Sequence, residues 1–207
     1  MMGTATMNGG AKISFTGRSG YGVRVGSGVM VANITETTIT GGGATGTGVI
    51  MESAQTMELN KVTIEGVGKG VNASKGKVDM MGGTVTFTGG NGNWGVQVGR
   101  GATANLMRAT IKGTNGQGTG LYVMGTATMN GGEISNVESG VYATGAGTLT
   151  INGEAKITVK GGAESYGVKV MGTGSATLTN MTIEGTSGGT GKGVEVSMGS
   201  SKTMTMT

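Results

Sequence analysis

A repeated dipeptide constrains the fold of this chain more than any other feature of its sequence. Eight copies of glycine followed by valine, once by leucine, are spaced at regular intervals of 20 to 27 residues. The copies begin at Gly22, Gly48, Gly70, Gly95, Gly120, Gly140, Gly167 and Gly193. A period of about 24 residues over most of a chain is typical of a solenoid, in which each repeat is one structural unit stacked on the next.

Each period contains two further short segments in which apolar and polar residues alternate. Examples are residues 57–59 and 62–64, and again residues 149–151 and 157–159. Period-two alternation predicts half-buried strands, and the glycines and asparagines between them suit turns that need positive φ. We therefore expect an all-β fold, a single-stranded right-handed parallel β-helix (solenoid) of eight to nine coils with three short strands each. A helix-bearing leucine-rich repeat is disfavoured, because no segment has a 3.6-residue period.

A longer period is superimposed on the short one. Gly22, Gly95 and Gly167 are 73 and 72 residues apart, and the nine-residue string at 2–10 recurs unchanged at 124–132. These spacings predict a three-coil unit of about 72 residues, present nearly three times. The core is expected to consist of stacked Val, Ile, Leu and Met, with Phe15 and Phe87 as its largest members.

The composition removes many enzymatic mechanisms. The chain has no cysteine, histidine or proline, and Asp79 is its only aspartate. Disulfides, zinc–thiolate sites, cysteine nucleophiles and histidine bases are therefore excluded. One aspartate and ten scattered glutamates are also a poor source of the grouped carboxylates that polysaccharide-cleaving β-helices use. We expect a non-enzymatic protein without a metal or cofactor, whose function depends on a binding surface.

Residues 1–207 are expected to form one β-helix that begins and stops inside the repeat. Residues 4–7 and 203–207 both match the middle strand of a coil, and no polar cap is visible at either end. The sequence shows no signal peptide and no apolar run of the roughly 20 residues that span a membrane. We therefore expect a fragment of a longer protein, or a rod that self-associates through its open coil ends.

The few aromatic residues are the first candidates for partner binding. Tyr21, Trp94 and Tyr166 each directly precede the glycine of a Gly-Val copy, so they should line one edge of the rod, three coils apart. Tyr122 and Tyr142 take the outward position of the same strand in adjacent coils and should touch. One interpretation is that each ring covers a local glycine-rich turn. The other is a set of anchors for a protein partner, because Tyr and Trp are favoured at binding hot spots.

A looser group of basic residues is the second candidate. Lys69, Lys75 and Lys77 flank the third Gly-Val copy, and Arg100 and Arg108 lie one coil further on. They are either solvated surface charge or a contact for an acidic receptor or a sulfated glycan. Nucleic-acid binding is not expected, because the 15 basic and 11 acidic residues are interleaved along the chain.

The repeat phrases also resemble a known family. G-V-x-V, M-N-G-G-x-I, T-I-x-G and V-T-F-T-G, with close variants of them through essentially the whole chain, look like passenger domains of Bartonella autotransporters, closest to the Bartonella angiogenic factor (BafA) family. The resemblance implies a secreted or bacterial cell-surface virulence factor, separated from its signal peptide and translocator barrel.

The same resemblance implies a function. It suggests a proangiogenic protein ligand that binds and activates a vascular endothelial growth factor receptor on host endothelial cells. The alternative is a non-signalling adhesin or structural passenger that binds the host cell surface or matrix. The resemblance assigns no functional residues.

Overall fold

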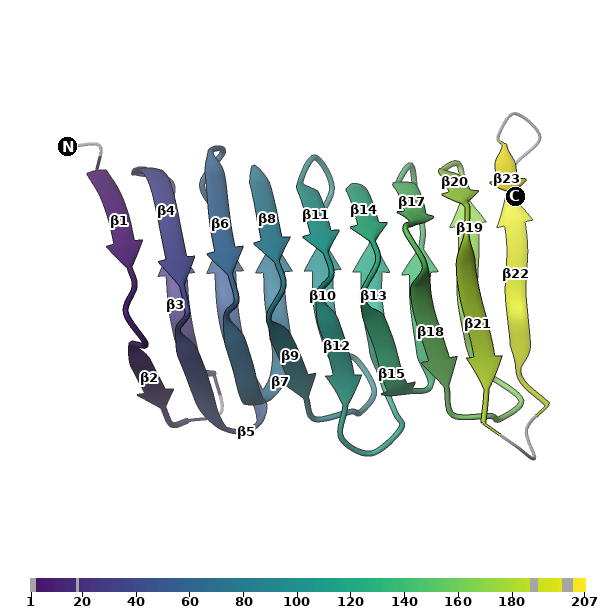
Figure 1. The fold of residues 1–207 in the computed structure, drawn as a ribbon, viewed down its shortest axis with the longest axis horizontal. Coiled ribbons are helices and arrows are strands. Elements are labelled where there is room, and N and C mark those ends of the chain that lie inside the picture. The colour runs from purple at the N-terminus through teal and green to yellow at the C-terminus, as the bar shows by residue number, and fades with distance from the viewer. Residues whose placement is uncertain (1–2, 18, 187–189, 199–202) are drawn as a thin grey trace.

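The computed structural model of the chain is an all-β solenoid and describes residues 3–17, 19–186, 190–198 and 203–207. Its strands stack in parallel from coil to coil, with about eight turns of about 25 residues each (Figure 1). The parallel β-helix predicted from the repeat is therefore confirmed. Across the described ranges there is no helix long and apolar enough to cross a membrane.

The middle strands of the coils form one face of the rod. They pair only in parallel and make a nine-stranded sheet. In sheet order the strands are β1 (Gly3–Met7), β4 (Val29–Thr35), β6 (Thr56–Asn60), β8 (Lys77–Met81), β11 (Thr103–Met107), β14 (Thr126–Asn130), β17 (Thr148–Asn152), β20 (Ser175–Leu178) and β23 (Met204–Met206).

The first and third strands of the coils form the other two faces. The first strands, which carry the Gly-Val copies, are β3 (Tyr21–Val25), β10 (Trp94–Val98), β13 (Thr119–Val123), β16 (Ser139–Ala143), β19 (Tyr166–Gly172) and β22 (Lys192–Met198). The third strands are β2 (Lys12–Phe15), β9 (Thr84–Phe87), β12 (Thr110–Gly113), β15 (Glu133–Val137), β18 (Ala155–Val159) and β21 (Met181–Gly185).

Two long strands differ from the predicted pattern of three short strands per coil. β5 (Thr38–Met51) and β7 (Thr63–Ala73) each run without a break from a third strand into the next first strand. They pair with each other from Thr38 to Met51, with register shifts only around Gly43. Because this pairing holds the expected turn in extended form, the two faces join into one 14-stranded sheet.

The Gly-Val copies contain glycine because there is no room for a side chain at this position, and not because the backbone requires a positive φ. None of the eight has a positive φ. A Cβ added at Gly120 would instead collide with Cγ2 of Ile134 and would lie 2.8 Å from the backbone oxygen of Gly140 in the next coil. Equivalent neighbours face the other copies, except Gly193, which has nothing within 4 Å. The repeated glycine therefore marks the position where one coil approaches the next too closely for a side chain. Positive φ is found at turn glycines such as Gly132, as expected.

The core consists of the inward columns of all three faces. Phe87 is fully buried, as are Met57, Met80 and Met129. Phe15 packs against the core but is only half-buried. Its prediction as a large core residue is therefore only partly right, because β2 lies in the outermost coil and has a neighbouring coil on one side only (Figure 1).

Strand register supports the three-coil period but not for every repeated segment. Tyr21 is aligned through Thr47 and Lys69 with Trp94, three coils further on. The identical nonapeptides lie on β1 and β14, which are five strands apart in the sheet, so they do not follow that period. Although their sequences match, Ala5 is exposed and Ala127 is buried, because β1 pairs on one side only. Self-association through such end strands stays a prediction.

Candidate binding groove

A run of aromatic side chains crosses the face made by the first strands. Strand pairing aligns two outward positions on β10, β13, β16 and β19. The first position holds Trp94, Thr119, Ser139 and Tyr166, and the second holds Gln97, Tyr122, Tyr142 and Lys169. Over four consecutive coils, Trp94 therefore stands in the first column, Tyr122 and Tyr142 stand in the second, and Tyr166 stands in the first again.

These four rings form one continuous ladder. The Trp94 and Tyr122 rings are stacked, with centroids 6.3 Å apart. Tyr122 and Tyr142 meet edge to face at 5.4 Å, and Tyr142 and Tyr166 do so at 6.1 Å. Each separation lies in the range of favourable aromatic pairs. The predicted contact between Tyr122 and Tyr142 is confirmed, and the ladder joins it to two of the three edge aromatics.

A lysine lies over the ring at each end of the aromatic ladder. Lys69 Nζ lies 4.6 Å from the ring centroid of Trp94, and Lys169 Nζ lies 5.1 Å from that of Tyr166. Both distances fit cation–π attraction. Lys169 is also held by Glu195, with 2.9 Å between Nζ and Oε1, and this hydrogen bond raises the pKa of the Lys169 ammonium.

Two pKa shifts describe the electrostatics around the Tyr166 end of the ladder. Hydrogen bonds from Lys192, the larger cause, and from Lys169 lower the pKa of the Glu195 carboxyl. This carboxylate therefore stays charged at lower pH than an ordinary glutamate. Burial raises the pKa of the Tyr166 phenol, although Ser139 and the charge of Lys169 oppose this shift. The phenol is therefore neutral at physiological pH.

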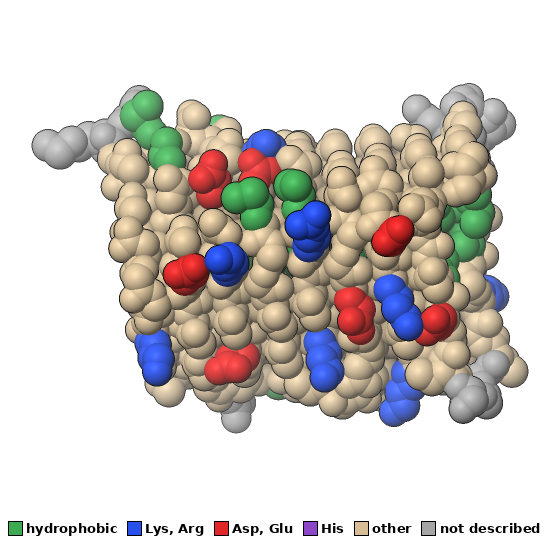
Figure 2. All heavy atoms as spheres, viewed as in Figure 1, with side chains coloured by type: hydrophobic (Ala, Val, Ile, Leu, Met, Phe, Trp, Pro, Cys, Tyr) green, Lys and Arg blue, Asp and Glu red, His purple; other side chains and the backbone are tan. Residues whose placement is uncertain are grey.

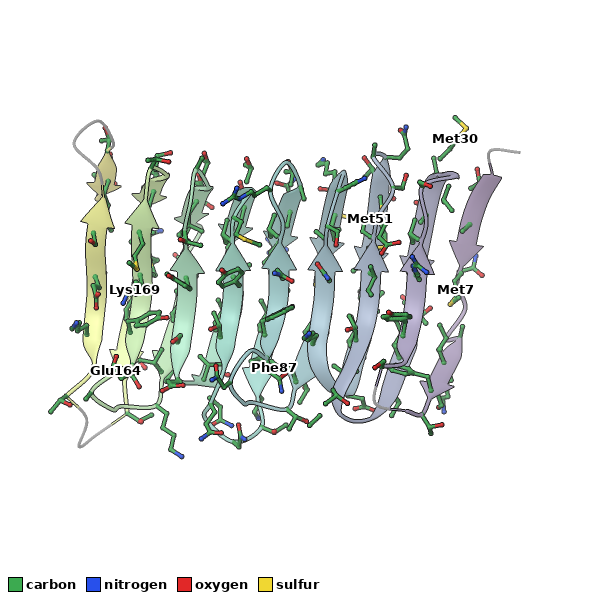
Figure 3. The ribbon with its side chains drawn as sticks, turned by 180° about the vertical axis from the view of Figure 1, so that it is seen from behind. Met7, Met30, Met51, Phe87, Glu164 and Lys169 are labelled. Carbon is green, nitrogen blue, oxygen red and sulfur yellow. The ribbon has the colours of Figure 1, made fainter. Side chains whose placement is uncertain are left out.

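The ladder lines an open groove of about 490 Å³. The loop 90–93 before β10 forms part of its wall, and Asn93 fixes this loop by donating from Nδ2 to the Thr88 oxygen at 2.8 Å and the Ala44 oxygen at 3.2 Å. Glu138 and Glu164 line the groove where the chain enters β16 and β19. Seen from behind, Figure 3 shows Glu164 and Lys169 beside the same part of this face.

The structure brings four of the five aromatic candidates together. Tyr21 lies in the same column as Trp94, as predicted, but three coils away and outside the groove, where it is 48% exposed. The positions that would continue a ladder from it hold Ile50 and Asn72 instead of tyrosines. Tyr21 is therefore a separate exposed ring.

The basic candidates lie at three separate places in two adjacent coils. Only Lys69 reaches the ladder. Lys77 pairs with Asp79 on β8, with 2.7 Å between Nζ and Oδ2, while Lys75 and Arg100 occupy corresponding turns before β8 and β11. Arg108 lies in the turn after β11 with a φ of 52°. The predicted basic group is thus not one patch, and Figure 2 shows charges of both signs scattered over the face of middle and third strands.

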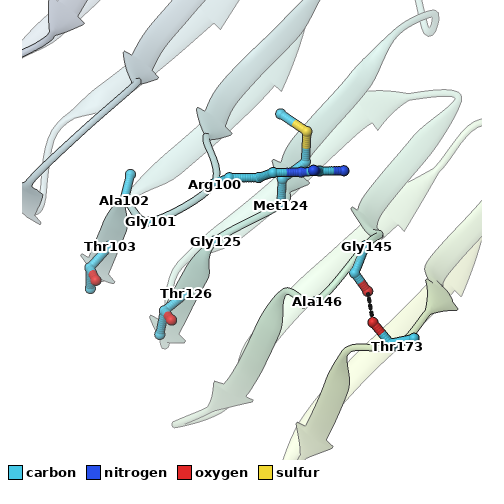
Figure 4. Close-up of a pocket in the computed structure, with 10 residues that line it drawn as sticks. All are labelled: Arg100, Gly101, Ala102, Thr103, Met124, Gly125, Thr126, Gly145, Ala146 and Thr173. Carbon is cyan, nitrogen blue, oxygen red and sulfur yellow. Dashed lines mark hydrogen bonds between the residues drawn. The ribbon is translucent and has the colours of Figure 1, made fainter.

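A second groove surrounds Arg100 in the turns that follow the first strands β10, β13, β16 and β19. It also measures about 490 Å³, and glycine, alanine and threonine residues of four consecutive turns line most of it (Figure 4). In this groove the Thr173 hydroxyl donates a hydrogen bond to the Gly145 oxygen at 3.3 Å. Arg100 is its single charged side chain, and this groove offers fewer distinct contacts than the aromatic one.

Sequence reasoning missed several residues of the aromatic groove. Lys169 follows Tyr122 and Tyr142 in the outward column, so the repeat spacing alone could have placed it there. Glu138 and Glu164 stand two and three residues before a Gly-Val copy. Their place beside the rings depends on the path of each turn into the strand, which no local pattern indicates.

Comparison with known proteins finds no relative: no protein-family model, no curated protein and no solved structure matches the chain. Within the described ranges, no three acidic side chains come close enough together to form a candidate metal site.

Proposed function

We propose that this protein is a non-enzymatic ligand that binds a host cell-surface receptor through the aromatic groove. The observation that carries the proposal is the ladder of Trp94, Tyr122, Tyr142 and Tyr166 along an open groove. Aromatic rings supply a large contact area and lose little rotamer freedom on binding. Parallel strands hold all four rings, so the surface is ordered before the partner arrives.

We further propose that the protein is secreted or displayed on the bacterial surface and that its partner is a vascular endothelial growth factor receptor. The support for this finer proposal is the likeness of the repeat phrases to the Bartonella angiogenic factor family. Such receptors signal when two are held close together. The described residues contain one aromatic ladder, because Ile50 and Asn72 replace its central tyrosines near Tyr21. Activation therefore requires two copies of this chain.

Removing the two central rings should abolish most receptor binding. We expect the double variant Tyr122→Ala/Tyr142→Ala to bind the receptor ectodomain at least about tenfold more weakly, because buried tyrosines at hot spots each contribute about 2 kcal/mol or more. Surface plasmon resonance with the immobilised ectodomain measures this loss.

Tyr21→Ala is the matched control for this experiment, since it removes the same type of ring from the same face outside the groove. Its affinity should stay within about twofold of wild type. Equal losses in the two variants, or none in either, would contradict the proposal. Receptor phosphorylation in endothelial cells then separates a signalling ligand from an adhesin, which would bind cells without it.

A further inference from the structure

The ladder already shows which kind of group its ring faces accept. Both terminal rings have an ammonium group of the same chain over them, Lys69 over Trp94 and Lys169 over Tyr166. Within the described residues no such cation lies over Tyr122 or Tyr142. Because aromatic faces attract cations through the ring quadrupole, these two central rings are open positions in a surface with cations at both ends.

The charge of the groove points to the same kind of ligand. Its lining contains the carboxylates of Glu138 and Glu164 and one cation, Lys169. Lys169 is paired with Glu195 at 2.9 Å, and Glu195 also pairs with Lys192 at 2.7 Å. Glu138 and Glu164 are both exposed, and neither forms a salt bridge with the described part of the chain. The carboxylates of Glu138 and Glu164 are therefore left without a cationic partner in the described part of the chain.

We propose that the groove binds a basic segment of its partner, with an arginine or lysine side chain placed over Tyr122 and Tyr142 beside Glu138 and Glu164. Aromatic faces and carboxylates together favour a cation, through cation–π attraction and charge-assisted hydrogen bonds. A sulfated glycan is disfavoured at this site, because its sulfates would be repelled by the two carboxylates. This inference rests on the proposed function only in taking the groove as the contact surface, and it specifies the chemistry of the partner.

Titration with short peptides tests the charge preference directly. Trp94 is the only tryptophan of the chain, so its fluorescence reports on this groove. The probe is a glycine–serine peptide with two arginines, and the comparison peptide carries neutral citrulline, which has nearly the same shape. We expect saturable binding of the arginine peptide, confirmed by calorimetry, and at least tenfold weaker binding of the citrulline peptide.

Two variants assign the effect to the carboxylates. Glu138→Gln/Glu164→Gln should weaken binding of the arginine peptide at least tenfold, whereas Glu133→Gln, an exposed carboxylate of β15 outside the groove, should leave it unchanged. The inference is overturned if both peptides bind equally, if neither binds, or if a heparin oligosaccharide binds the wild type more tightly than the arginine peptide does.

The receptor ectodomain separates failure of this inference from failure of the proposed function. If the arginine peptide binds but the ectodomain does not, the charge preference holds and the proposed receptor is wrong. If the ectodomain binds wild type and Glu138→Gln/Glu164→Gln equally well but loses affinity for Tyr122→Ala/Tyr142→Ala, the groove is the contact surface and the cationic ligand is wrong.

Discussion

Gly120→Ala should lower the free energy of unfolding by about 2 to 3 kcal/mol, although it adds a single methyl group. The new Cβ would collide with Ile134 and press on the backbone oxygen of Gly140. Neither neighbour can move freely, because Ile134 is fully buried in the core and Gly140 lies within β16. Overpacking of this kind costs about 1 to 3 kcal/mol and occasionally more. Urea unfolding followed by far-ultraviolet circular dichroism measures the change.

Gly193 provides the control for this prediction. It belongs to the same repeat signature and has no positive φ, but an added Cβ would meet nothing within 4 Å. Gly193→Ala should therefore change the free energy of unfolding by no more than about 0.5 kcal/mol. An equal loss for both variants would show that the glycines are needed for backbone conformation, and our explanation of the repeat would be wrong.

Phe87→Ala should be the most destabilising single truncation of the core, at about 3 to 5 kcal/mol. Phe87 is the largest of the fully buried side chains, and its removal leaves a cavity that stacked coils cannot readily close. Unfolding in urea measures this loss, and an unchanged urea slope would show that the folded state remains intact.

Phe15 is the matched control because it lies 72 residues earlier, at the equivalent position of the three-coil unit. It is half-buried in the outermost coil. We expect Phe15→Ala to cost less than half as much as Phe87→Ala, since fewer contacts are lost. Similar costs would mean that Phe15 is covered in solution, and self-association through the end coils would be the first explanation to examine.

Most of the fold could be predicted from the sequence because each coil of a solenoid repeats the same short pattern of strands and turns. The Gly-Val copies mark the first strands, and alternation marks the other two, so register needs no long-range information. The exceptions arise where neighbouring coils decide the outcome. β5 and β7 stay extended because each pairs with the other along its length. Ala5 and Ala127 differ in burial within identical nonapeptides because only one of them lies between two coils.

The candidate site is less predictable for a similar reason. Tyr122 and Tyr142 were placed correctly because they share one strand position in consecutive repeats. The ladder also needs Trp94 and Tyr166 to approach them diagonally from a second column, and that approach depends on side-chain directions. Proximity in sequence grouped Lys69, Lys75 and Arg108, although Lys69 lies over Trp94, Lys75 lies in the turn before β8 and Arg108 lies in the turn after β11.

Site-directed photo-cross-linking on endothelial cells tests most directly whether the aromatic groove is the contact surface. Benzoylphenylalanine would be placed at Asn91, an exposed residue of the groove, and separately at Lys112, an exposed residue of β12 on the third-strand face. Cross-linking from Asn91 to a vascular endothelial growth factor receptor, with none from Lys112, is the result we predict. Cross-linking to the receptor from Lys112 and not from Asn91 would contradict the assignment of the groove, and no cross-link to such a receptor from either position would contradict the proposed partner.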